Sequence, residues 1–447
     1  MTGNQDDIKK YAIDRMSAPM QQFMENEKSG GIVLGISVLI AMFLANSSWA
    51  ESYFEVLHYK IGLYFGGDAF IELSLLHWIN DALMAVFFFV VGLELKREFV
   101  GGELSQPRKA LLPIFAALGG MLVPALIYVS LNPGPEVQHG WGIPMATDIA
   151  FALGVMYLLG NKVPFSLKVF LTALAIVDDL GAVIVIALFY SSDISVIHLL
   201  SGLGFALAMY LGNKAGIRNV LFYIVLGIGG VWVSFLLSGV HATIAAVLAA
   251  FMIPADVAIN ENTLIKRVSN HLERFRKIDP NNKVTTLKED QVHVLGEMNA
   301  DIQRAMPPLQ RLEVAMHPYV TFFVLPVFAL ANAGVSLDVN PGELFSTNVA
   351  LGVALGLLIG KVIGVVGFTL ILIKLNIAPW PDGMNLRNLF GLGLLAAIGF
   401  TMSLFVTSLA FQHEVYMTQA KLGIFAASIM GGVLGYMVLN KNNKRKI

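Results

Sequence analysis

The sequence predicts an all-α polytopic membrane protein. Hydrophobic residues make up 56% of the 447 residues and charged residues only 14%, whereas a soluble domain carries about 25% charge. Mean hydropathy is +0.69. Long apolar runs recur from one end of the chain to the other, and they lack the alternation typical of strands in a membrane β-barrel.

Twelve apolar segments are predicted to cross the membrane as helices, because each approaches the roughly 20 residues that span a bilayer. Several of them are short or interrupted by glycine. The predicted spans cover residues 30–47, 75–93, 111–130, 142–159, 165–190, 196–211, 219–235, 239–253, 318–334, 350–373, 389–411 and 419–439.

The distribution of Lys and Arg predicts the orientation of these helices. The N-terminal segment 1–28, the tail 441–447 and every second loop between them are rich in cations, whereas the loops on the other side hold only Lys60. Cytoplasmic loops carry the excess of Lys and Arg in membrane proteins. We therefore expect both termini to be cytoplasmic and the helix count to be even.

Two segments between the spans are predicted to lie outside the bilayer. Residues 58–73 contain two β-prone runs around Gly66-Gly67-Asp68 and predict a hairpin on the outer, periplasmic side. Residues 255–308 form a long cytoplasmic insert, for which a solvated loop with some helix is favoured over a separate domain. Four apolar residues at helical spacing predict an amphipathic helix there: Ile265, Val268, Leu272 and Phe275.

These features divide the chain into a cytoplasmic N-terminal segment, two groups of spans, an insert and a tail. The boundaries are 1–28, 29–254 with the hairpin at 58–73, 255–308, 309–440 and 441–447. The first 28 residues have no apolar core, so we expect no cleavable signal peptide.

Composition also excludes some classes of function. The net charge of -1 gives no overall field that would attract nucleic acid. The absence of cysteine excludes disulfides, thiolate metal sites and cysteine nucleophiles, and leaves the redox compartment undecided.

Two adjacent aspartates, Asp178 and Asp179, lie near the middle of the fifth predicted span. A charge at that depth costs about 2.5–3.5 kcal/mol even on the insertion scale that gives the lowest values. Two close carboxylates repel each other as anions, and they can relieve this repulsion by binding protons or a hard cation with a preference for oxygen ligands. A purely structural link between helices is the alternative interpretation. The pair therefore predicts a site that binds either protons or a cation.

Asp148 lies in GIPMATDIAF (142–151), where Pro144 and the polar Thr147-Asp148 pair predict a break within the fourth span. The carboxylate would offset the partial positive charge of an exposed helix N-terminus. LLAAIGFTMSLF (394–405) predicts a matching break in the eleventh span. Two interrupted helices in corresponding positions of two halves indicate a transporter binding site.

Three other charged residues, within predicted spans or at their ends, are candidate functional groups. Lys361 lies about halfway along the tenth span and needs an acidic partner or a helix C-terminus; it could be a structural link or a proton carrier. Asp81 opens the second span and Glu94 closes it, and either could equally be an interfacial residue.

Two histidines have both structural and functional interpretations. His241 begins the eighth span, where a structural role is more common than a functional one. Glu313 and His317 are four residues apart at the start of the ninth span and can interact on one helix face. Titration of this pair near neutral pH and simple helix capping both remain open.

Eight motifs in this sequence resemble those of the bacterial NhaA-type sodium/proton antiporter family, over residues 28–254 and 309–440. The ATDIAFALG and VDDLGA portions are the most specific. The motifs are WINDALMAVFF, GLELKRE, ATDIAFALGV, LTALAIVDDLGA, SGVHAT, FALANAGVSL, LIGK and IGFTMSLF.

The resemblance implies twelve helices with an inverted repeat, in which the fourth and eleventh helices are broken and cross. It implies that Asp178 and Asp179 bind Na+ or Li+ and carry protons, with Asp148 and Thr147 close to the cation. Lys361 would pair with Asp178, and Lys361 and Asp148 would neutralise the facing helix ends.

The resemblance further implies an electrogenic secondary transporter of the bacterial inner membrane that exports sodium by alternating access. The protein would be neither an enzyme nor dependent on a cofactor, and its partners would be Na+, Li+, H+, lipid and a second copy joined through the outer hairpin. Glu94, His241, Glu313 and His317 would belong to the pH response, with Asp81 as a possible accessory residue. The insert is longer than in the best-known members.

Two other functions share part of this pattern. A sodium-coupled solute symporter of related architecture would need a larger pocket and an organic substrate. An intramembrane aspartyl protease would need its two carboxylates on different helices and a GxGD motif, whereas this pair is adjacent and lies in VDDLG.

Overall fold

The computed structural model describes residues 29–65, 68–191, 194–278, 286–336 and 347–441. The N-terminal segment 1–28 and all but the first residue of the basic tail lie outside these residues. The chain forms two compact units. Unit 1 comprises Met1–Phe87, Glu103–Ser192 and Pro318–Ile447, and unit 2 comprises Phe88–Gly102 and Asp193–His317.

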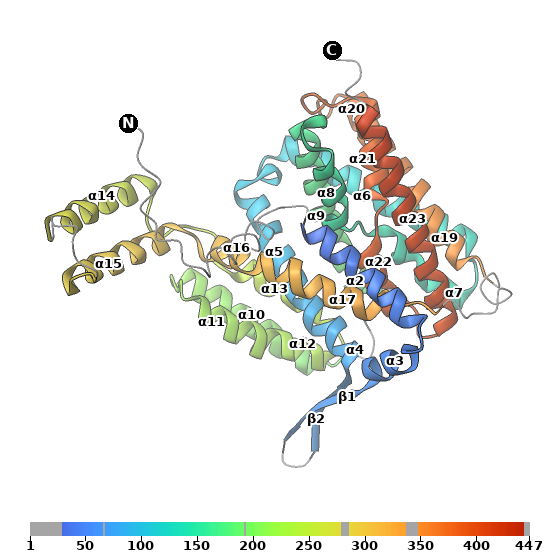
Figure 1. Cartoon of the computed structure of the whole chain (residues 1–447), viewed down its shortest axis with the longest axis horizontal. Coiled ribbons are helices and arrows are strands. Elements are labelled where there is room, and N and C mark those ends of the chain that lie inside the picture. Colours follow the sequence, from blue (N-terminus) through green and yellow to red (C-terminus); the bar gives the residue numbers. More distant parts are fainter. Residues whose placement is uncertain (1–28, 66–67, 192–193, 279–285, 337–346, 442–447) are drawn as a thin grey trace. The chain divides into compact units, whose positions relative to one another are not determined.

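Unit 1 is helical apart from one pair of strands (Figure 1). The short η elements are 3-10 or π-helical stretches. In chain order, the elements of unit 1 are α2 (Ser29–Ala45), α3 (Ala50–His58), β1 (Lys60–Phe65), β2 (Asp68–Ser74), α4 (Leu75–Trp78), η1 (Ile79–Leu83), α5 (Met84–Gly101, which continues into unit 2), η2 (Glu103–Ser105), α6 (Pro107–Leu131), α7 (Pro135–Gln138), η3 (His139–Met145), α8 (Ile149–Leu158), η4 (Gly160–Lys162), α9 (Phe165–Phe189), η6 (Val320–Val324), α17 (Leu325–Asn332), α19 (Val349–Leu355), η7 (Gly356–Gly360), α20 (Lys361–Lys374), α21 (Leu386–Ala396), α22 (Phe400–Ala410) and α23 (Glu414–Asn440).

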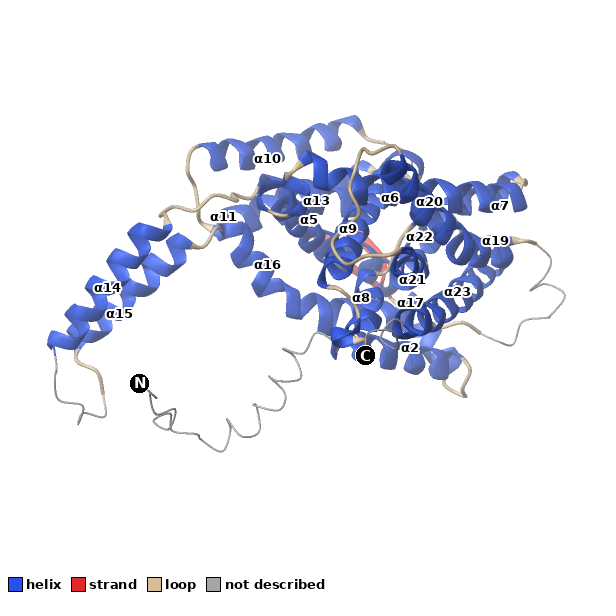
Figure 2. Ribbon diagram, turned by 90° about the horizontal axis from the view of Figure 1, so that it is seen from above, coloured by secondary structure: helices blue, strands red, loops and turns tan. Residues whose placement is uncertain are grey.

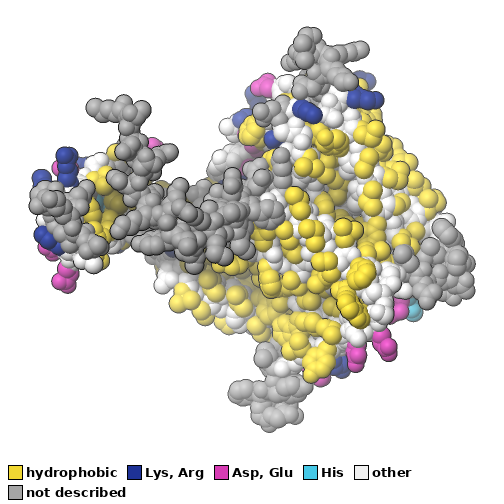
Figure 3. All heavy atoms as spheres, viewed as in Figure 1, with side chains coloured by type: hydrophobic (Ala, Val, Ile, Leu, Met, Phe, Trp, Pro, Cys, Tyr) yellow, Lys and Arg dark blue, Asp and Glu magenta, His cyan; other side chains and the backbone are white. Residues whose placement is uncertain are grey.

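The outer helices of unit 1 expose large apolar side chains instead of burying them. Leu39 and Phe43 of α2 and Ile429 and Val433 of α23 are all exposed, and hydrophobic side chains cover the face formed by these helices (Figure 3). A helix that is apolar on every side suits a lipid environment. This confirms the prediction of a multi-pass membrane protein.

Among the described residues, eight helices are long and apolar enough to cross a membrane, or up to eleven if each of three bent helix pairs counts as one span. The eighth predicted span falls on α13 (Ala242–Met252), an apolar helix of only 11 residues. The expected count of twelve therefore remains a prediction.

The two predicted helix breaks are confirmed. Pro135–Met145 and α8 meet at an angle of 41°, and α21 and α22 meet at 44°. Residues 146–148 and 398–399 are not helical. Seen from above, α8, α9, α21 and α22 lie inward of α2, α19 and α23 (Figure 2).

Helices α6 and α20 cross with almost no space between their backbones. A Cβ atom added at Gly119 would lie 2.3 Å from the carbonyl oxygen of Gly364, and one added at Gly364 would lie 2.0 Å from that of Gly119. Only glycine permits this approach. The crossing places Lys361, at the start of α20, beside Gly120 of α6.

The predicted hairpin is present as the antiparallel pair β1 and β2. Lys60 pairs with Ser74 at its base, and the register shifts between Leu63 and Tyr64. The turn residues Gly66 and Gly67 lie outside the described residues. The side of the membrane on which the hairpin lies remains a prediction.

Unit 2 combines apolar helices with a polar hairpin made of two helices, α14 (Glu261–Ile278) and α15 (Glu289–Ala305). The hairpin falls within the predicted insert, and its first helix includes all four residues expected at helical spacing, which confirms that helix. Besides its part of α5, the elements of unit 2 are α10 (Val196–Lys214), α11 (Val220–Ile224), η5 (Val225–Trp232), α12 (Val233–Ser238), α13, α14, α15 and α16 (Pro308–Tyr319).

Candidate functional site

Asp178 and Asp179 lie just past the middle of the 25-residue helix α9, with exposed fractions of 0% and 1%. The helix forms because its sequence is almost entirely apolar around them. Neither carboxylate reaches solvent in this structure. The chain therefore places two adjacent acids in an interior where a charge requires close compensation.

The two contacts of the Asp178 carboxylate converge on one of its oxygens. Lys361 Nζ donates to Oδ2 at 2.5 Å, and Thr147 Oγ1 donates to the same atom at 2.7 Å. Lys361 is itself fully buried. Among the described residues, Oδ1 of Asp178 has no hydrogen-bond partner.

Thr147 links this carboxylate to the second broken helix. Its hydroxyl also lies 3.0 Å from the carbonyl oxygen of Ala396, the last residue of α21. The resemblance implied that Lys361 pairs with Asp178, and the structure shows this contact. Its implied role in neutralising a helix end remains a prediction.

Asp148 caps the N-termini of two helices at once. Its Oδ1 accepts the amide of Phe151 in α8 at 3.0 Å, and its Oδ2 accepts the amide of Thr401 in α22 at 3.0 Å. The hydroxyl of Thr401 donates to the same Oδ2 at 2.5 Å. The carboxylate therefore lies at the partially positive ends of both half-helices, as predicted for the first of them.

Hydrogen bonds to backbone carbonyls join the two broken helices. The amide of Asp148 donates to the carbonyl of Ile398 at 2.6 Å, and the hydroxyl of Ser403 donates to the carbonyl of Ile143 at 2.8 Å. These bonds satisfy backbone groups that the breaks leave without helical partners. The two interrupted helices thus form one polar junction inside an apolar bundle.

The oxygens of this junction belong to the ligand class that hard cations prefer. They are carboxylate, hydroxyl and carbonyl oxygens. Within the described part of the chain, no group of three or more His, Cys, Asp or Glu side chains could hold a metal ion.

Comparison with known proteins identifies the family. The sequence model described as Na+/H+ antiporter 1 matches residues 21–439. The chain belongs to this Na+/H+ antiporter family.

Relatives with curated names cover nearly the whole chain. The Na(+)/H(+) antiporter NhaA of Oleidesulfovibrio alaskensis is 46% identical over 427 residues, which is 96% of this chain and 94% of the relative. The Na(+)/H(+) antiporter NhaA 1 of Saccharophagus degradans is 46% identical over 431 residues, which is 96% of this chain and 92% of the relative. The Na(+)/H(+) antiporter NhaA of Helicobacter pylori strain G27 is 44% identical over 438 residues, which is 98% of each chain.

The other predicted residues of this member of the family are divided between the two units. Glu94 and Glu313 both belong to unit 2. Glu313 Oε1 forms an ion pair with Arg97 Nη1 at 2.5 Å. Arg97 also contacts Glu98 at 3.1 Å, and the suggested interaction of Glu313 with His317 remains a prediction.

Asp81 and His241 occupy helix junctions. Asp81 lies in the π-helical stretch η1, where the extra residue per turn alters the direction of side chains. His241 is the residue just before α13. Both are half-buried.

Sequence reasoning missed two polar contacts. Thr401 lies in the segment predicted to break (394–405), but the sequence does not indicate that it bonds Asp148. Asn80 and Asn332 are both buried, and their side chains form a 2.8 Å hydrogen bond between η1 and α17. The sequence does place each of these asparagines within an apolar motif. That position indicates a polar contact, because a buried side-chain amide requires a hydrogen-bond partner.

Proposed function

We propose that this protein exports sodium in exchange for protons, with Asp178 and Asp179 as a shared site for both ions. The observation that carries the proposal is the buried contact of Asp178 with Lys361 and Thr147 at the junction of two broken helices. Family membership supports the same reaction, and the names of the relatives state it for those proteins.

Competition between the ions follows from the charges around Asp178. Lys361 occupies the position beside Oδ2 that a cation would take, so sodium must displace or reposition the ammonium group. A proton on the aspartate pair removes the negative charge that attracts sodium. The two ligands therefore exclude each other, and binding of either one releases the other, because linkage is reciprocal.

The broken helices support alternating access. Each break presents helix ends at the same junction, and rocking of the surrounding helices can open that junction to either side of the membrane. Under this proposal the repeats are inverted and the exchange is electrogenic, with more protons than sodium ions moved per cycle. Li+ would be accepted as a second substrate, because it shares the charge and ligand preference of Na+.

The pH response is assigned to a cluster in unit 2, where Glu313, Arg97 and Glu98 already form ion pairs. Glu94 lies one helical turn before Glu98 on α5. His241 and His317 complete the set, with Asp81 as an accessory residue. Protonation of Glu98 and Glu313 would break their ion pairs with Arg97. Acid pH would therefore remove a link between α5 and α16.

Assembly and location complete the proposal. The protein would lie in the bacterial inner membrane with both termini in the cytoplasm, and two copies would join through β1 and β2. The two-stranded form of the sheet in the described residues supports this, because its outer edges offer a template for pairing with another strand. Deletion of residues 60–72 should shift the detergent-solubilised protein toward monomer while leaving exchange largely intact; an unchanged dimer fraction would place the contact elsewhere.

The decisive experiment uses purified protein in sealed lipid vesicles with a fluorescent pH indicator inside. Addition of NaCl without any organic solute should drive proton movement, and choline chloride should not. This result separates an antiporter from a solute symporter, which needs its solute, and from a protease, which moves no protons. A sodium response that appears only after a solute is added would contradict the proposal.

Calorimetry of the purified protein tests the shared site. Apparent sodium affinity should improve as pH rises, and binding should release protons, seen as heats that depend on the ionisation enthalpy of the buffer. Sodium affinity independent of pH, with no proton released, would indicate separate paths for the two ions.

A further inference from the structure

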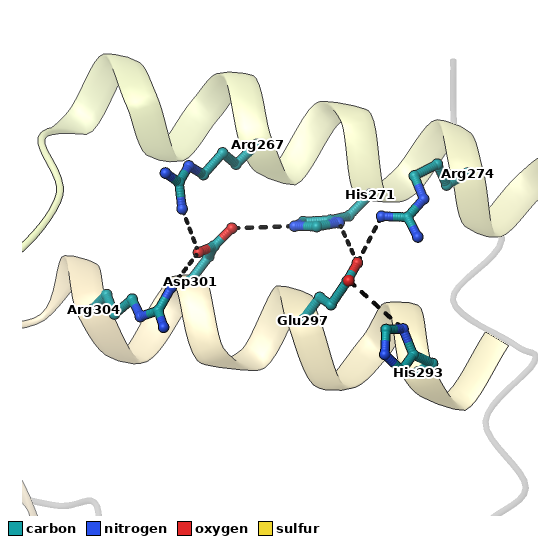
Figure 4. A network of polar contacts seen from close by, with 7 residues as sticks. All are labelled: Arg267, His271, Arg274, His293, Glu297, Asp301 and Arg304. Atoms are coloured by element: carbon teal, nitrogen blue, oxygen red, sulfur yellow. Dashed lines mark hydrogen bonds and ion pairs between the residues drawn. The ribbon is translucent and has the colours of Figure 1, made fainter. Parts of the chain in front are cut away.

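The helical hairpin of unit 2 is held together by a row of ion pairs between α14 and α15 (Figure 4). Arg267 and His271 both contact Asp301, at 3.0 and 3.1 Å, and Arg274 contacts Glu297 at 2.6 Å. Asp301 is nearly buried between the helices. These contacts define the seam along which the two helices pack.

A second, apolar row follows this seam on each helix. On α14, Val268, Leu272 and Phe275 each come directly after a seam residue. On α15, the residues directly after the seam positions Gln291, Val294, Met298 and Asp301 are Val292, Leu295, Asn299 and Ile302. One residue corresponds to a rotation of about 100°. Because the helices are antiparallel and the rotation has the same sense on each, both rows lie on one face of the hairpin.

This apolar face is exposed. Leu272 and Val292 have exposed fractions of 55% and 56%, and Ile265, Leu295 and Ile302 are also exposed. Hydrophobic side chains are visible on the hairpin in Figure 3. The opposite face differs, because Asn270 and Ala300 line a polar cavity of about 550 Å³ there together with seam residues.

The spacing of the apolar row is that of a helical bundle. Ile265, Val268, Leu272 and Phe275 are separated by three, four and three residues, and the row on α15 has the same alternation. This pattern forms a narrow seam suited to another helix. Asn299 occupies one position of the row, and a single polar residue in such a seam commonly fixes the register with a partner helix.

We propose that this face pairs with the same face of a second copy of the chain, with the facing helices antiparallel. Charge at the helix ends supports such a partner. Each helix is acidic in its first turn and basic in its last: α14 begins with Glu261 and ends with Arg276 and Lys277, and α15 begins with Glu289 and Asp290 and ends with Arg304. Any antiparallel pairing places acidic ends opposite basic ends.

The balance of charge favours a second copy over an anionic bilayer surface. The two helices together hold six Lys or Arg residues and six Asp or Glu residues, so their net charge is zero with His neutral. Helices that bind the surface of anionic membranes carry an excess of Lys and Arg on their polar face. A two-fold pair of identical hairpins needs only self-complementarity.

The attachment of the hairpin reduces the cost of association. Its base is closed by the bond from the amide of Ala258 to the carbonyl of Arg304, and the amide of Leu309 bonds the carbonyl of Pro254 beside the apolar helix α13. Both ends are therefore tied to membrane helices, which confine two copies to one plane. Confinement raises the effective concentration, so a small interface can suffice.

Because the natural chain has no cysteine, cross-linking tests the face directly. Full-length Leu272→Cys and Leu295→Cys variants are oxidised in native membranes, each alone and as a co-expressed mixture with two different tags. We expect a disulfide-linked dimer in at least one of these samples. The matched controls are Asn270→Cys and Ala300→Cys on the opposite face, for which we expect none.

A second measurement uses Val292→Cys as the reporter. Adding Leu272→Glu should reduce its cross-linking at least tenfold, whereas Asn270→Glu should not. Equal cross-linking from the two faces, or none from the apolar face, would overturn the proposal. So would transfer of a photoreactive label at position 272 to lipid or to residues 1–28 in place of a second copy. Dimer formation is read without any transport assay, so the result is independent of the proposed exchange activity.

Discussion

Thr401 donates both its amide and its hydroxyl to the same oxygen of Asp148, at 3.0 and 2.5 Å, although the two residues lie 253 positions apart. The same carboxylate accepts the amide of Phe151 in its own half-helix. Asp148 therefore joins the N-termini of α8 and α22. Removal of a donor from one half-helix would therefore also weaken the hydrogen bonding that positions the other.

Thr401→Val removes one of these donors while keeping the size of the side chain. The buried carboxylate would lose a charge-assisted hydrogen bond, which costs about 1–3 kcal/mol. We expect a lower thermal unfolding temperature in detergent and weaker apparent sodium affinity. The matched control is Thr407→Val in the same helix, whose hydroxyl donates to the carbonyl of Ser403 at 2.7 Å. Equal effects of the two substitutions would show that the Asp148 contact has no special role.

Asp178→Asn and Asp179→Asn should each reduce sodium-dependent proton movement in vesicles to the level of protein-free vesicles. The two variants should differ in stability. Only Asp178→Asn leaves the buried ammonium of Lys361 without its anionic partner, and breaking such a pair costs about 3–5 kcal/mol.

The double variant Asp178→Asn with Lys361→Met separates these two effects. Removing both charges should restore much of the stability, because the ammonium group that lost its carboxylate partner is no longer present. Transport should stay absent. Normal exchange in either single variant would remove the aspartate pair from the mechanism.

Gly364→Ala tests whether the close crossing of α6 and α20 is needed to position Lys361. The added Cβ would lie 2.0 Å from the carbonyl oxygen of Gly119, so the backbones must separate. Overpacking of this kind costs typically about 1–3 kcal/mol. Unfolding temperature and exchange rate should both fall. Gly367→Ala on the same helix should be tolerated, because nothing lies within 4 Å of the added atom.

The hairpin of unit 2 should lose stability in acid. The hydrogen bond from His271 is the largest cause that lowers the pKa of Asp301 below its ordinary value, with Arg267 as a further contributor. A lowered pKa in the folded state means that the stabilising contribution is present above the ordinary value of about 3.9 and is lost as pH falls through the lowered value. The protection of the α14 and α15 amides, measured as the exchange rate relative to that of an unfolded chain at the same pH, should therefore fall at strongly acidic pH.

Asp301→Asn provides the comparison for that measurement. Its hairpin should exchange faster than the native one at neutral pH, and its protection relative to an unfolded chain at the same pH should depend less on acid pH. An unchanged exchange rate at neutral pH would show that the ion pairs of Asp301 do not hold the two helices together.

The sequence by itself determined the membrane class, the approximate positions of the helices and the two breaks. These features follow from local properties. Apolar length makes a membrane helix, and the polar residues around Thr147-Asp148 and Gly399 interrupt one. The helix through Ile265 and Leu272 was predictable for the same reason, since its spacing is a property of consecutive residues.

Only the tertiary structure decided which residues meet. Thr401 bonds Asp148, Glu313 pairs with Arg97, and Asn80 bonds Asn332. In all three cases the two residues lie more than 200 positions apart in the sequence. A buried polar group requires a partner, but its sequence neighbours do not specify which one. Contacts such as the crossing of Gly119 and Gly364 fix that choice, because they set how closely whole helices approach and therefore which side chains face each other.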